Sequence, residues 1–435
     1  MQFLVSPAEG LRGRLGVAGD KSISHRSIIL GSIAEGITRV NGILEGEDVL
    51  ATIAAFRKMG VNIQRTGHRQ YEIVGVGLHG LAQPDGPMDM GNSGTAFRLL
   101  TGLLSGQKWS SSLIGDESLS IRPMGRIMSP LEAMGADIQS RDGCPPLEIR
   151  PVDKLVGQHY DMPIASAQVK SCLLLAGLYA QGRTSVMEPA PTRDHTERML
   201  QGFGYQVDVS DEGVIALESG GSLRGCDIDV PADLSSATFF ILAGLIIPNS
   251  ELVLTGVGVN PTRNGVLRIF EKMGGNIEVQ NQRIVGGEPV ADLVVRSSNL
   301  HACDIAGEDI ALAIDEVPAI SIAAACASGV TRIRDAEELR VKESDRIRSV
   351  VNGLKALGGK VEELPDGMNI EGGYLGGGTV ESVGDHRIAM AFSVAGGVAK
   401  EAVTINDCAN VATSFPDFRD LANRVGLAIE VNDQV

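Results

Sequence analysis

The stretch KMGVNI at residues 58–63 recurs along the chain in five related versions, each closing a charged amphipathic segment. The other copies are AMGADI (133–138), GFGYQV (202–207), KMGGNI (272–277), ALGGKV (356–361) and RVGLAI (424–429). Neighbouring copies lie 68 to 84 residues apart, a spacing that is typical of a repeated supersecondary unit. We therefore expect six units of one kind, which together account for all 435 residues.

The glycine in each copy predicts a helix that ends there and is followed at once by a strand. A second series of segments is nearly uncharged, and helices that are apolar on all sides are buried. These segments are SGTAFRLLTGLLSG (93–106), SAQVKSCLLLAGLYAQ (166–181), SSATFFILAGLIIP (235–248), EVPAISIAAACAS (316–328) and HRIAMAFSVAGG (386–397). Each unit is thus expected to pair a buried helix with an exposed one, joined by strands such as ELVLTG (251–256). This pattern predicts an α/β fold.

The chain is longer than a single hydrophobic core usually supports, so we expect two domains. The last unit ends soon after AIEVND (428–433), while the strand-like segments QFLVSP (2–7) and LRGRLGVAG (11–19) precede the first helix. We expect these N-terminal strands to complete the sixth unit, which places both termini in one domain. The predicted domains are residues 1–19 with 240–435, and residues 20–239. The predicted crossovers lie near 19–21 and 232–240.

The composition excludes several classes of protein. There are 38 Lys and Arg against 54 Asp and Glu, a formal charge of -16, which opposes nucleic acid and anionic lipid as partners. Only 4% of the residues are aromatic, too few for a typical surface that stacks bases. The longest apolar stretch, 239–247, is far shorter than the roughly 18 residues that span a bilayer. We therefore expect no membrane association.

The cysteines and the absent motifs bear on location and on metals. The six Cys residues form no CxxC pair and several lie in apolar runs, which predicts buried thiols in a reducing compartment. The N-terminus MQFLVSPAEG lacks the cationic flank of a signal peptide, so we expect the cytoplasm. The sequence contains no HExxH and no GxxxxGK[ST], so neither a metal site nor a P-loop is predicted.

The starts of the uncharged helices are candidate anion sites, because free backbone N–H groups and the helix dipole favour negative charge there. These starts read GDKSISHR (19–26), GNSGTAFR (91–98), ASAQVK (165–170), ADLSSAT (232–238), AIDEVP (313–318) and GDHR (384–387). Any one of them alone is better explained as an ordinary N-cap. Cations at or near several of them favour a shared anion site. These cations are Lys21, Arg26, Arg98, Arg122, Arg193, Lys342, Arg346 and Arg387.

Two acidic positions are candidates for proton transfer. Asp315 lies beside Glu316 between apolar flanks, where a carboxylate serves either as a helix cap or as a functional group such as a general base. Glu343 follows Lys342 and is a second candidate. The run RVKESDRIR (340–348), taken alone, is more typical of an exposed helix face than of a site.

Together and in this order, these motifs resemble the 5-enolpyruvylshikimate-3-phosphate synthase family. IRPMGR (121–126), PTRDHTE (191–197) and TSFPDF (413–418) extend the resemblance over essentially the whole chain. The resemblance implies two domains, each of three βαβαββ units, with the active site in the cleft between them. It also implies transfer of the enolpyruvyl group of phosphoenolpyruvate to the 5-hydroxyl of shikimate 3-phosphate, with release of phosphate by addition and then elimination. No cofactor is expected, since charge stabilisation and proton transfer suffice.

The resemblance also implies a role for each site residue. Asp315 takes the 5-hydroxyl proton, and Lys21 and Glu343 are the two candidates for protonating the methylene carbon, with their order left open. The expected substrate contacts are Lys21, Ser22, Arg26, Asn92, Gly94, Arg122, Ser166, Ala167, Gln168, Arg193, Asp315, Lys342, Arg346, His386 and Arg387.

Three positions bear on differences within this family. Ala167 stands where many members have a second Ser, and Thr413 stands where many have Lys, so each removes one expected contact. Gly94 leaves room for a longer mimic of phosphoenolpyruvate, which predicts inhibition by glyphosate.

Two alternative functions are less consistent with the sequence. The related UDP-N-acetylglucosamine enolpyruvyl transferases place a Cys on the loop that here reads GDESLSIRPMGR (115–126), which contains none. An RNA-end-processing or RNA-binding protein built on the same repeat is disfavoured by the acidity of the chain. We expect a monomer.

Overall fold

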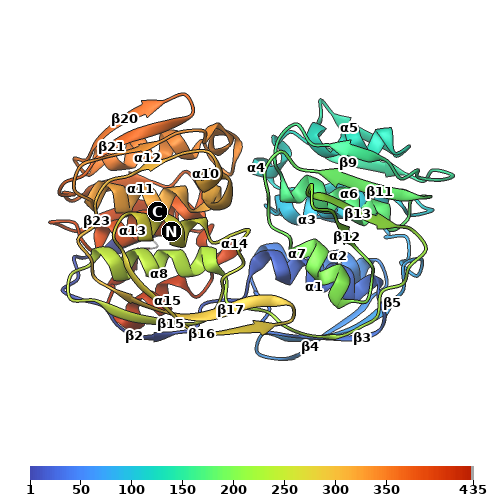
Figure 1. Cartoon of the computed structure of the whole chain (residues 1–435), viewed down its shortest axis with the longest axis horizontal. Coiled ribbons are helices and arrows are strands. Elements are labelled where there is room, and N and C mark those ends of the chain that lie inside the picture. Colours follow the sequence, from blue (N-terminus) through green and yellow to red (C-terminus); the bar gives the residue numbers. More distant parts are fainter. Residues whose placement is uncertain (433–435) are drawn as a thin grey trace. The chain divides into compact units, whose positions relative to one another are not determined.

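The computed structural model describes residues 1–432, which form two compact units that are described here one at a time (Figure 1). Unit 1 contains residues 1–18, 231–284 and 288 onward, and unit 2 contains residues 19–230 and 285–287. The predicted boundary at 239/240 is wrong, because it falls inside the continuous apolar helix α8 (Leu234–Ile246). The chain instead changes unit at Val230/Pro231 and, one residue before the predicted position, at Ala18/Gly19.

The strands form six four-stranded sheets with one common pattern. In unit 2 the strand orders are β14-β3-β5-β4, β6-β7-β9-β8 and β10-β11-β13-β12. In unit 1 they are β16-β17-β15-β2, β18-β19-β21-β20 and β22-β23-β1-β24. Each sheet has one parallel pair at an edge, which is β14/β3, β6/β7, β10/β11, β2/β15, β18/β19 or β22/β23. The repeat predicted from the glycines is therefore present six times in the sheets.

The strands of unit 2 are β3 (Glu35–Asn41), β4 (Asn62–Gly67), β5 (Gln70–Val76), β6 (Met88–Asp89), β7 (Ser111–Ile114), β8 (Asp137–Arg141), β9 (Cys144–Arg150), β10 (His159–Asp161), β11 (Arg183–Met187), β12 (Asp208–Val209), β13 (Val214–Glu218) and β14 (Asp227–Asp229). Those of unit 1 are β1 (Gln2–Val5), β2 (Arg12–Leu15), β15 (Glu251–Gly258), β16 (Asn276–Val285), β17 (Glu288–Arg296), β18 (Asp304–Ile305), β19 (Val330–Ile333), β20 (Lys360–Leu364), β21 (Gly367–Glu371), β22 (Gly378–Glu381), β23 (Val403–Asn406) and β24 (Ile429–Asn432).

Only one of the two N-terminal strands completes the sixth unit. β1 pairs antiparallel with both β23 and β24, as predicted, whereas β2 lies parallel to β15 in another sheet. The expectation for β2 is wrong because β2 supplies the parallel edge strand beside β15, and the chain crosses to unit 2 only after it. β2 thus precedes the first helix of unit 2, and β14 precedes α8 of unit 1.

The helices form the two predicted series. The buried helices are α1 (Lys21–Ile33), α3 (Gly94–Ser105) and α6 (Ala167–Gly177) in unit 2, and α8, α11 (Val317–Cys326) and α13 (His386–Gly396) in unit 1. The helices that end at the repeated glycines are α2 (Glu47–Lys58), α5 (Gly125–Ala133), α7 (His195–Gly202), α9 (Gly265–Lys272), α12 (Arg346–Ala356) and α15 (Phe418–Val425). All six glycines have φ between +77° and +107°, the left-handed conformation that favours glycine. Short helical turns complete the chain: α4 (Glu117–Ser120), α10 (Glu308–Ala313), α14 (Val411–Ser414), η1 (Ile314–Glu316) and η2 (Glu337–Val341).

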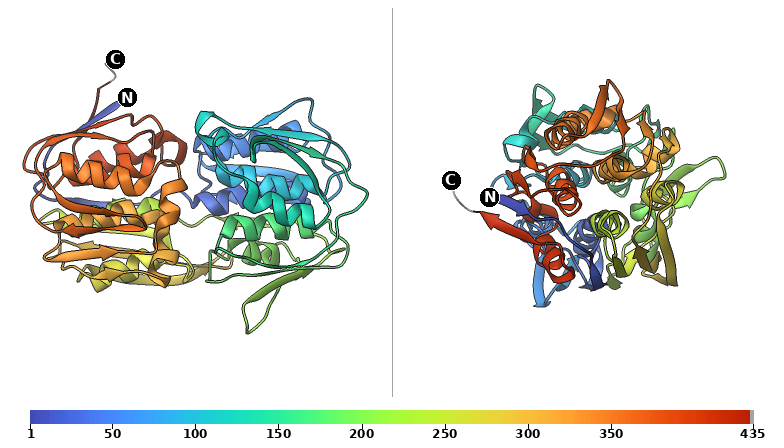
Figure 2. Two further views of the ribbon diagram at one scale, coloured as in Figure 1. Left: turned by 90° about the horizontal axis from the view of Figure 1, so that it is seen from above. Right: turned by 90° about the vertical axis from the view of Figure 1, so that its left-hand side faces the viewer.

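The buried helices form the core of each unit. In unit 1, α8, α11 and α13 contact one another, and Figure 2 (right) shows the helices of this unit nearly end-on with strands outside them. In unit 2, α3 contacts both α1 and α6. Burial of these apolar faces supplies most of the stabilisation, at roughly 25 cal/mol per Å² of apolar surface. Because the three helices of a unit lie together, their starts lie close enough to share hydrogen bonds.

The structure also bears on the predictions about membrane-spanning helices and about the cysteines. Within residues 1–432, no helix is both long and apolar enough to cross a membrane. All six cysteines are free, and Cys172 and Cys408 are buried, whereas the other four are only half-buried. The prediction of buried thiols is therefore correct for two of them, because the others lie at the edges of elements rather than in their apolar centres.

Candidate active site

Five of the six buried helices begin at a side chain that caps them. Asp20, Ser93, Ser166, Asp233 and Asp385 each accept a hydrogen bond from a backbone N–H two or three residues further along. These positions are therefore N-caps, and the site rests on the side chains around them. The sixth helix, α11, differs because Glu316 at its N-cap makes no such bond and Asp315 lies one residue earlier, in η1. Asp315 is thus not the cap of α11.

In unit 2, Arg26 of α1 is fixed by two other helices. Its Nε donates to Thr196 Oγ1 of α7 at 2.6 Å, and its Nη2 donates to Ser171 Oγ of α6 at 2.6 Å. The two hydroxyls lie 2.7 Å apart, and Arg26 Nη1 donates to the Ser22 carbonyl at 2.9 Å. Arg26 is only 4% exposed, so its guanidinium is held in one orientation by partners from α1, α6 and α7.

A second arginine, Arg122, lies against the start of α3. Asn92 Nδ2 donates to Asp116 Oδ2 at 2.7 Å, while its Oδ1 accepts from Arg122 Nη2 at 2.8 Å. Arg122 Nη2 also donates to Ser118 Oγ at 3.1 Å. A Cβ built on Gly94 would lie 3.3 Å from Arg122 Nη1, so the backbone here closely approaches the guanidinium. Asn92, Gly94 and Arg122 are therefore brought together, as predicted.

A third link joins the starts of α3 and α6. Arg98 Nη1 donates to Gln168 Oε1 at 2.7 Å, and Gln168 Nε2 donates to Thr95 Oγ1 at 3.0 Å. Ser166 caps α6 and Ala167 is its first residue, so neither backbone N–H has an acceptor within the helix. The predicted anion-binding start of α6 is consistent with this geometry.

Two further cations belong to unit 2. Lys21 forms a short ion pair with Asp48 of α2. Arg193 lies in the segment between β11 and α7 that forms no helix or strand. Next to Lys21 in space, His25 is fully buried, and burial, together with Lys21 and Arg26, lowers the pKa of His25 well below its usual range. His25 is therefore a neutral hydrogen-bonding residue, with Nδ1 2.8 Å from Thr52 Oγ1.

In unit 1, Arg346 gathers three carboxylates at the start of α12. Its Nε lies 2.8 Å from Asp385 Oδ2, its Nη2 2.6 Å from Glu343 Oε2, and its Nη1 3.5 Å from Asp315 Oδ1. Burial alone would lower the pKa of Arg346, but the carboxylates of Asp385, Glu343 and Asp315 raise it above its usual range. The side chain is 1% exposed, so the RVKESDRIR run is not a simple exposed face.

The carboxylate of Asp385 is the buried counterpart of Arg346. Burial would raise the pKa of Asp385, yet the charge and hydrogen bonds of Arg346 hold it below its usual range. Asp385 Oδ2 also accepts from Ser344 Oγ at 3.0 Å, and Oδ1 accepts from the backbone N–H of Arg387 at 2.9 Å. One carboxylate thus orders both the 342–346 segment and the start of α13.

Asp315 lies among cations. Its Oδ1 is 3.5 Å from Lys342 Nζ and 3.5 Å from Arg346 Nη1. Its backbone carbonyl accepts from Arg387 Nη1 at 2.9 Å, and the same Nη1 lies 3.3 Å from Glu316 Oε1. The structure therefore brings the predicted base together with three predicted cations of unit 1. His386, the first residue of α13, is 7% exposed and adjoins Asp385.

Thr413 differs from the lysine expected at its position in many relatives. Its Oγ1 donates to the Asn410 carbonyl at 2.7 Å, within the short helix α14. The threonine therefore supplies no positive charge.

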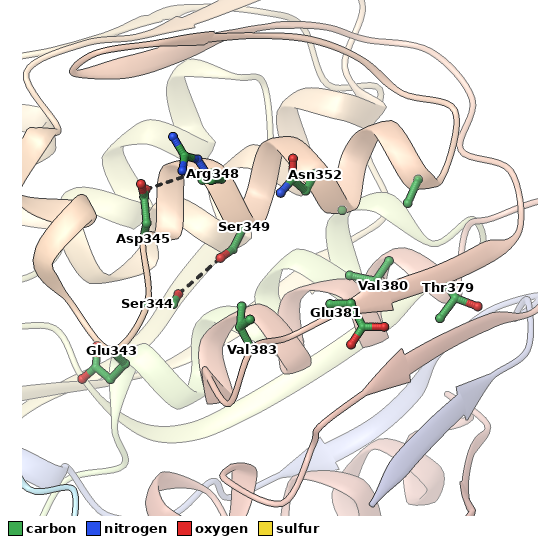
Figure 3. A pocket seen from close by; sticks show the side chains of 12 residues that line it. Glu343, Ser344, Asp345, Arg348, Ser349, Asn352, Thr379, Val380, Glu381 and Val383 are labelled. Atoms are coloured by element: carbon green, nitrogen blue, oxygen red, sulfur yellow. Dashed lines mark hydrogen bonds between the residues drawn. The ribbon is translucent and has the colours of Figure 1, made fainter. Parts of the chain in front are cut away.

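A cavity of about 550 Å³ borders the 342–346 segment (Figure 3). It runs along α12, with Val380 and Glu381 of β22 on its other side, and Ser344 contacts Ser349 across its wall. The lining contains the carboxylates of Glu343, Asp345 and Glu381 but only one cation, Arg348. This charge balance does not suit an anionic ligand, so the cavity is not the predicted anion site.

Three partners that orient predicted arginines were not themselves predicted from the sequence. Ser171, Thr196 and Asp385 each bind a predicted arginine but are small polar residues or caps without a distinctive pattern. Asp385 lies within the quoted GDHR motif, where its position at the helix start favours a cap.

Comparison with known proteins places the chain among enzymes of one kind. The sequence model of the family described as "EPSP synthase (3-phosphoshikimate 1-carboxyvinyltransferase)" matches residues 5–421. The protein named 3-phosphoshikimate 1-carboxyvinyltransferase from Alkalilimnicola ehrlichii is 57% identical over 100% of this chain and 97% of its own length. The protein of the same name from Methylococcus capsulatus is 56% identical over 99% and 98%. A solved structure of EPSP synthase from Acinetobacter baumannii covers 99% of this chain and 100% of its own, with a TM-score of 0.89 and 51% identity.

Proposed function

Because the chain belongs to the EPSP synthase (3-phosphoshikimate 1-carboxyvinyltransferase) family, we propose that the side chains assembled in its two units perform that family's reaction. The chain is a transferase whose substrates are phosphoenolpyruvate and shikimate 3-phosphate. It moves the enolpyruvyl group to the 5-hydroxyl and releases phosphate, a step in the biosynthesis of chorismate and the aromatic amino acids. The observation that supports the assignment of roles is the carboxylate of Asp315, held 3.5 Å from both Lys342 and Arg346.

We assign the binding of shikimate 3-phosphate chiefly to unit 2. Arg26, fixed by three partners, presents a guanidinium whose orientation does not have to be ordered on binding. The start of α6 offers backbone N–H groups at Ser166 and Ala167 for the phosphate. Lys21, Ser22, Gln168 and Arg193 of unit 2 and Lys342 of unit 1 complete this set.

We assign the binding of phosphoenolpyruvate to arginines from both units. Arg122 is oriented by Asn92, and Gly94 places no side chain against its guanidinium. Arg346 and Arg387 are oriented by carboxylates behind them, and His386 lies at the start of the same helix. Arginine suits this role because its planar fork binds phosphate and carboxylate through two parallel hydrogen bonds.

The chemistry follows from the charges. Asp315 removes the proton from the 5-hydroxyl of shikimate 3-phosphate, and the hydroxyl oxygen attacks C2 of phosphoenolpyruvate. An acid protonates C3, which becomes a methyl group. In the second step the C2–O bond to phosphate breaks, and a base removes a proton from the methyl group to restore the double bond. Lys21, paired with Asp48, and Glu343, paired with Arg346, are the two candidates for transfer at C3. Preorganised arginines stabilise the negative charge of the transition state.

Family membership sets aside the two alternatives, a UDP-N-acetylglucosamine enolpyruvyl transferase and an RNA-end-processing protein. We further propose that the protein works in the cytoplasm as a monomer, without nucleic acid. The formal charge of -16 supports the last of these points.

Identification of the product tests the proposed function. The protein is mixed with phosphoenolpyruvate and either shikimate 3-phosphate or UDP-N-acetylglucosamine, and the mixture is followed by proton and phosphorus NMR. We expect new vinyl signals of an enolpyruvyl ether and free phosphate only with shikimate 3-phosphate. Product only with the nucleotide sugar, or with neither acceptor, would contradict the proposal.

A further inference from the structure

Lys170 is a buried cation that the reaction described above does not use. It lies in the fourth position of the otherwise uncharged helix α6, and its side chain is 1% exposed. Its Nζ lies 2.8 Å from Glu188 Oε2, 2.7 Å from Glu197 Oε1 and 3.5 Å from the Thr192 carbonyl. Both carboxylate side chains are only 6% exposed. Burying three charged groups is costly unless they serve as a specific link, since an apolar residue would pack there at least as well.

The three partners of Lys170 all belong to one stretch of chain. Glu188 directly follows β11, Thr192 lies in the segment without helix or strand, and Glu197 is in the first turn of α7. Glu188 in turn accepts hydrogen bonds from the backbone N–H of Thr192, at 3.4 Å, and from its hydroxyl. Lys170 therefore fixes residues 188–197 to α6 at three points, on both sides of Arg193.

A second link between α6 and α7 lies beside the first. Ser171, next to Lys170, contacts Thr196, next to Glu197, and the two hydroxyls are the groups that hold Arg26. Ser171 Oγ also donates to the carbonyl of Ala167 at the start of α6, at 2.6 Å. Any shift of α7 against α6 would therefore move Arg193, reorient Arg26 and disturb the start of α6 together.

We propose that Lys170, with Glu188 and Glu197, is a positioning residue for shikimate 3-phosphate, acting through Arg193 and the segment 188–197. This inference rests on the proposed function, because it takes Arg193 as a contact of that substrate. The contacts of Lys170 Nζ with Glu188, Glu197 and the Thr192 carbonyl occupy its ammonium group, so its effect on the ligand is indirect.

The charges of Lys170, Glu188 and Glu197 indicate that the link between α6 and residues 188–197 depends on the ammonium group of Lys170. Burial raises the pKa of Glu197 despite the nearby ammonium of Lys170, and within residues 1–432 its Oε2 contacts no hydrogen-bond donor. Without Lys170, two buried carboxylates would face each other, and the segment would have to open to hydrate them.

Binding of shikimate 3-phosphate in the absence of phosphoenolpyruvate, measured by isothermal titration calorimetry, tests the proposal. We expect Lys170→Met to raise the Kd about tenfold while kcat at saturation changes less than about threefold. Lys154→Met, at an exposed lysine of the same unit, is the matched control and should leave the Kd unchanged. If Lys170→Met does not fold, Glu188→Gln provides the test, because it weakens the bonds to both Lys170 and Thr192 and should raise the Kd similarly.

A double-mutant cycle separates positioning from a purely structural role. If Lys170 acts through Arg193, then Lys170→Met should raise the Kd by less than about threefold in an Arg193→Ala background. The inference would be overturned if Lys170→Met lowered the melting temperature without changing the Kd, or if its effect on the Kd and that of Arg193→Ala were fully additive. Either result leaves the proposed function standing, as long as the unaltered protein binds shikimate 3-phosphate and turns over. Failure of the unaltered protein to bind shikimate 3-phosphate would overturn both the inference and the proposed function.

Discussion

Replacing Arg346 tests whether its guanidinium holds three carboxylates together at the start of α12. Arg346→Met leaves Asp385, which is 0% exposed, without its main counter-charge. Breaking a buried ion pair in this way typically costs about 3–5 kcal/mol. Arg346→Lys keeps the charge, but one ammonium cannot reproduce contacts made separately by Nε, Nη1 and Nη2. Loss of at least one hydrogen bond to a charged group predicts a cost of about 1.5–3 kcal/mol.

The free energy of unfolding is measured in urea at pH 7, with circular dichroism as the probe. Arg348→Lys on the same helix is the matched control, because that side chain is 65% exposed and its Nε lies 3.9 Å from the carboxylate of Glu363. This control should lie within about 0.5 kcal/mol of the unaltered protein. If Arg346→Met and Arg346→Lys both lowered the free energy of unfolding by no more than the control does, the account of this cluster would be refuted.

Three further predictions concern other parts of the molecule. In Gly94→Ala the new Cβ would lie 2.8 Å from Arg98 Nη1 and take up room that a longer mimic of phosphoenolpyruvate needs. We therefore expect the glyphosate concentration for half-inhibition to rise about tenfold or more, as phosphate-release assays would show. Because burial lowers the pKa of His25, the imidazole becomes protonated in the unfolded chain just below pH 6.5 while it stays neutral in the folded chain. The free energy of unfolding in urea should therefore fall by up to about 1.4 kcal/mol for each unit that the pH drops below 6.5, and less steeply in His25→Gln. Burial raises the pKa of Cys172 to about 12, so iodoacetamide at pH 8 should modify half-buried Cys144 but spare Cys172 until urea is added, as mass spectrometry would show.

The local parts of the fold could be predicted from the sequence. A glycine after an amphipathic helix has a clear physical meaning, and Gly60, like its five counterparts, adopts the left-handed conformation. The uncharged segments became buried helices because no face of them has an affinity for water. The placement of β2 in the sheet of β15 could not be predicted, because pairing between strands more than 200 residues apart leaves no local pattern.

The candidate site shows the same division. Cations at helix starts stand out in an acidic chain, and Arg26, Arg122, Arg346 and Arg387 do bind partners at those starts. Some of the groups that orient them, namely Ser171, Thr196 and the cap Asp385, are common residue types that give no signal of their own. Lys170 is an exception, because a lysine inside the apolar run VKSCLLLAG (169–177) is as unusual as Asp315 between its apolar flanks.

The rate of phosphate release from phosphoenolpyruvate by the unaltered protein and by Asp315→Asn tests the central claim most directly. The substitution keeps the size of the side chain and removes the carboxylate that faces Lys342 and Arg346. The account predicts release that requires shikimate 3-phosphate, and a kcat that falls by about 100-fold or more in the variant with little change in KM. Release without shikimate 3-phosphate, or a variant as active as the unaltered protein, would contradict it.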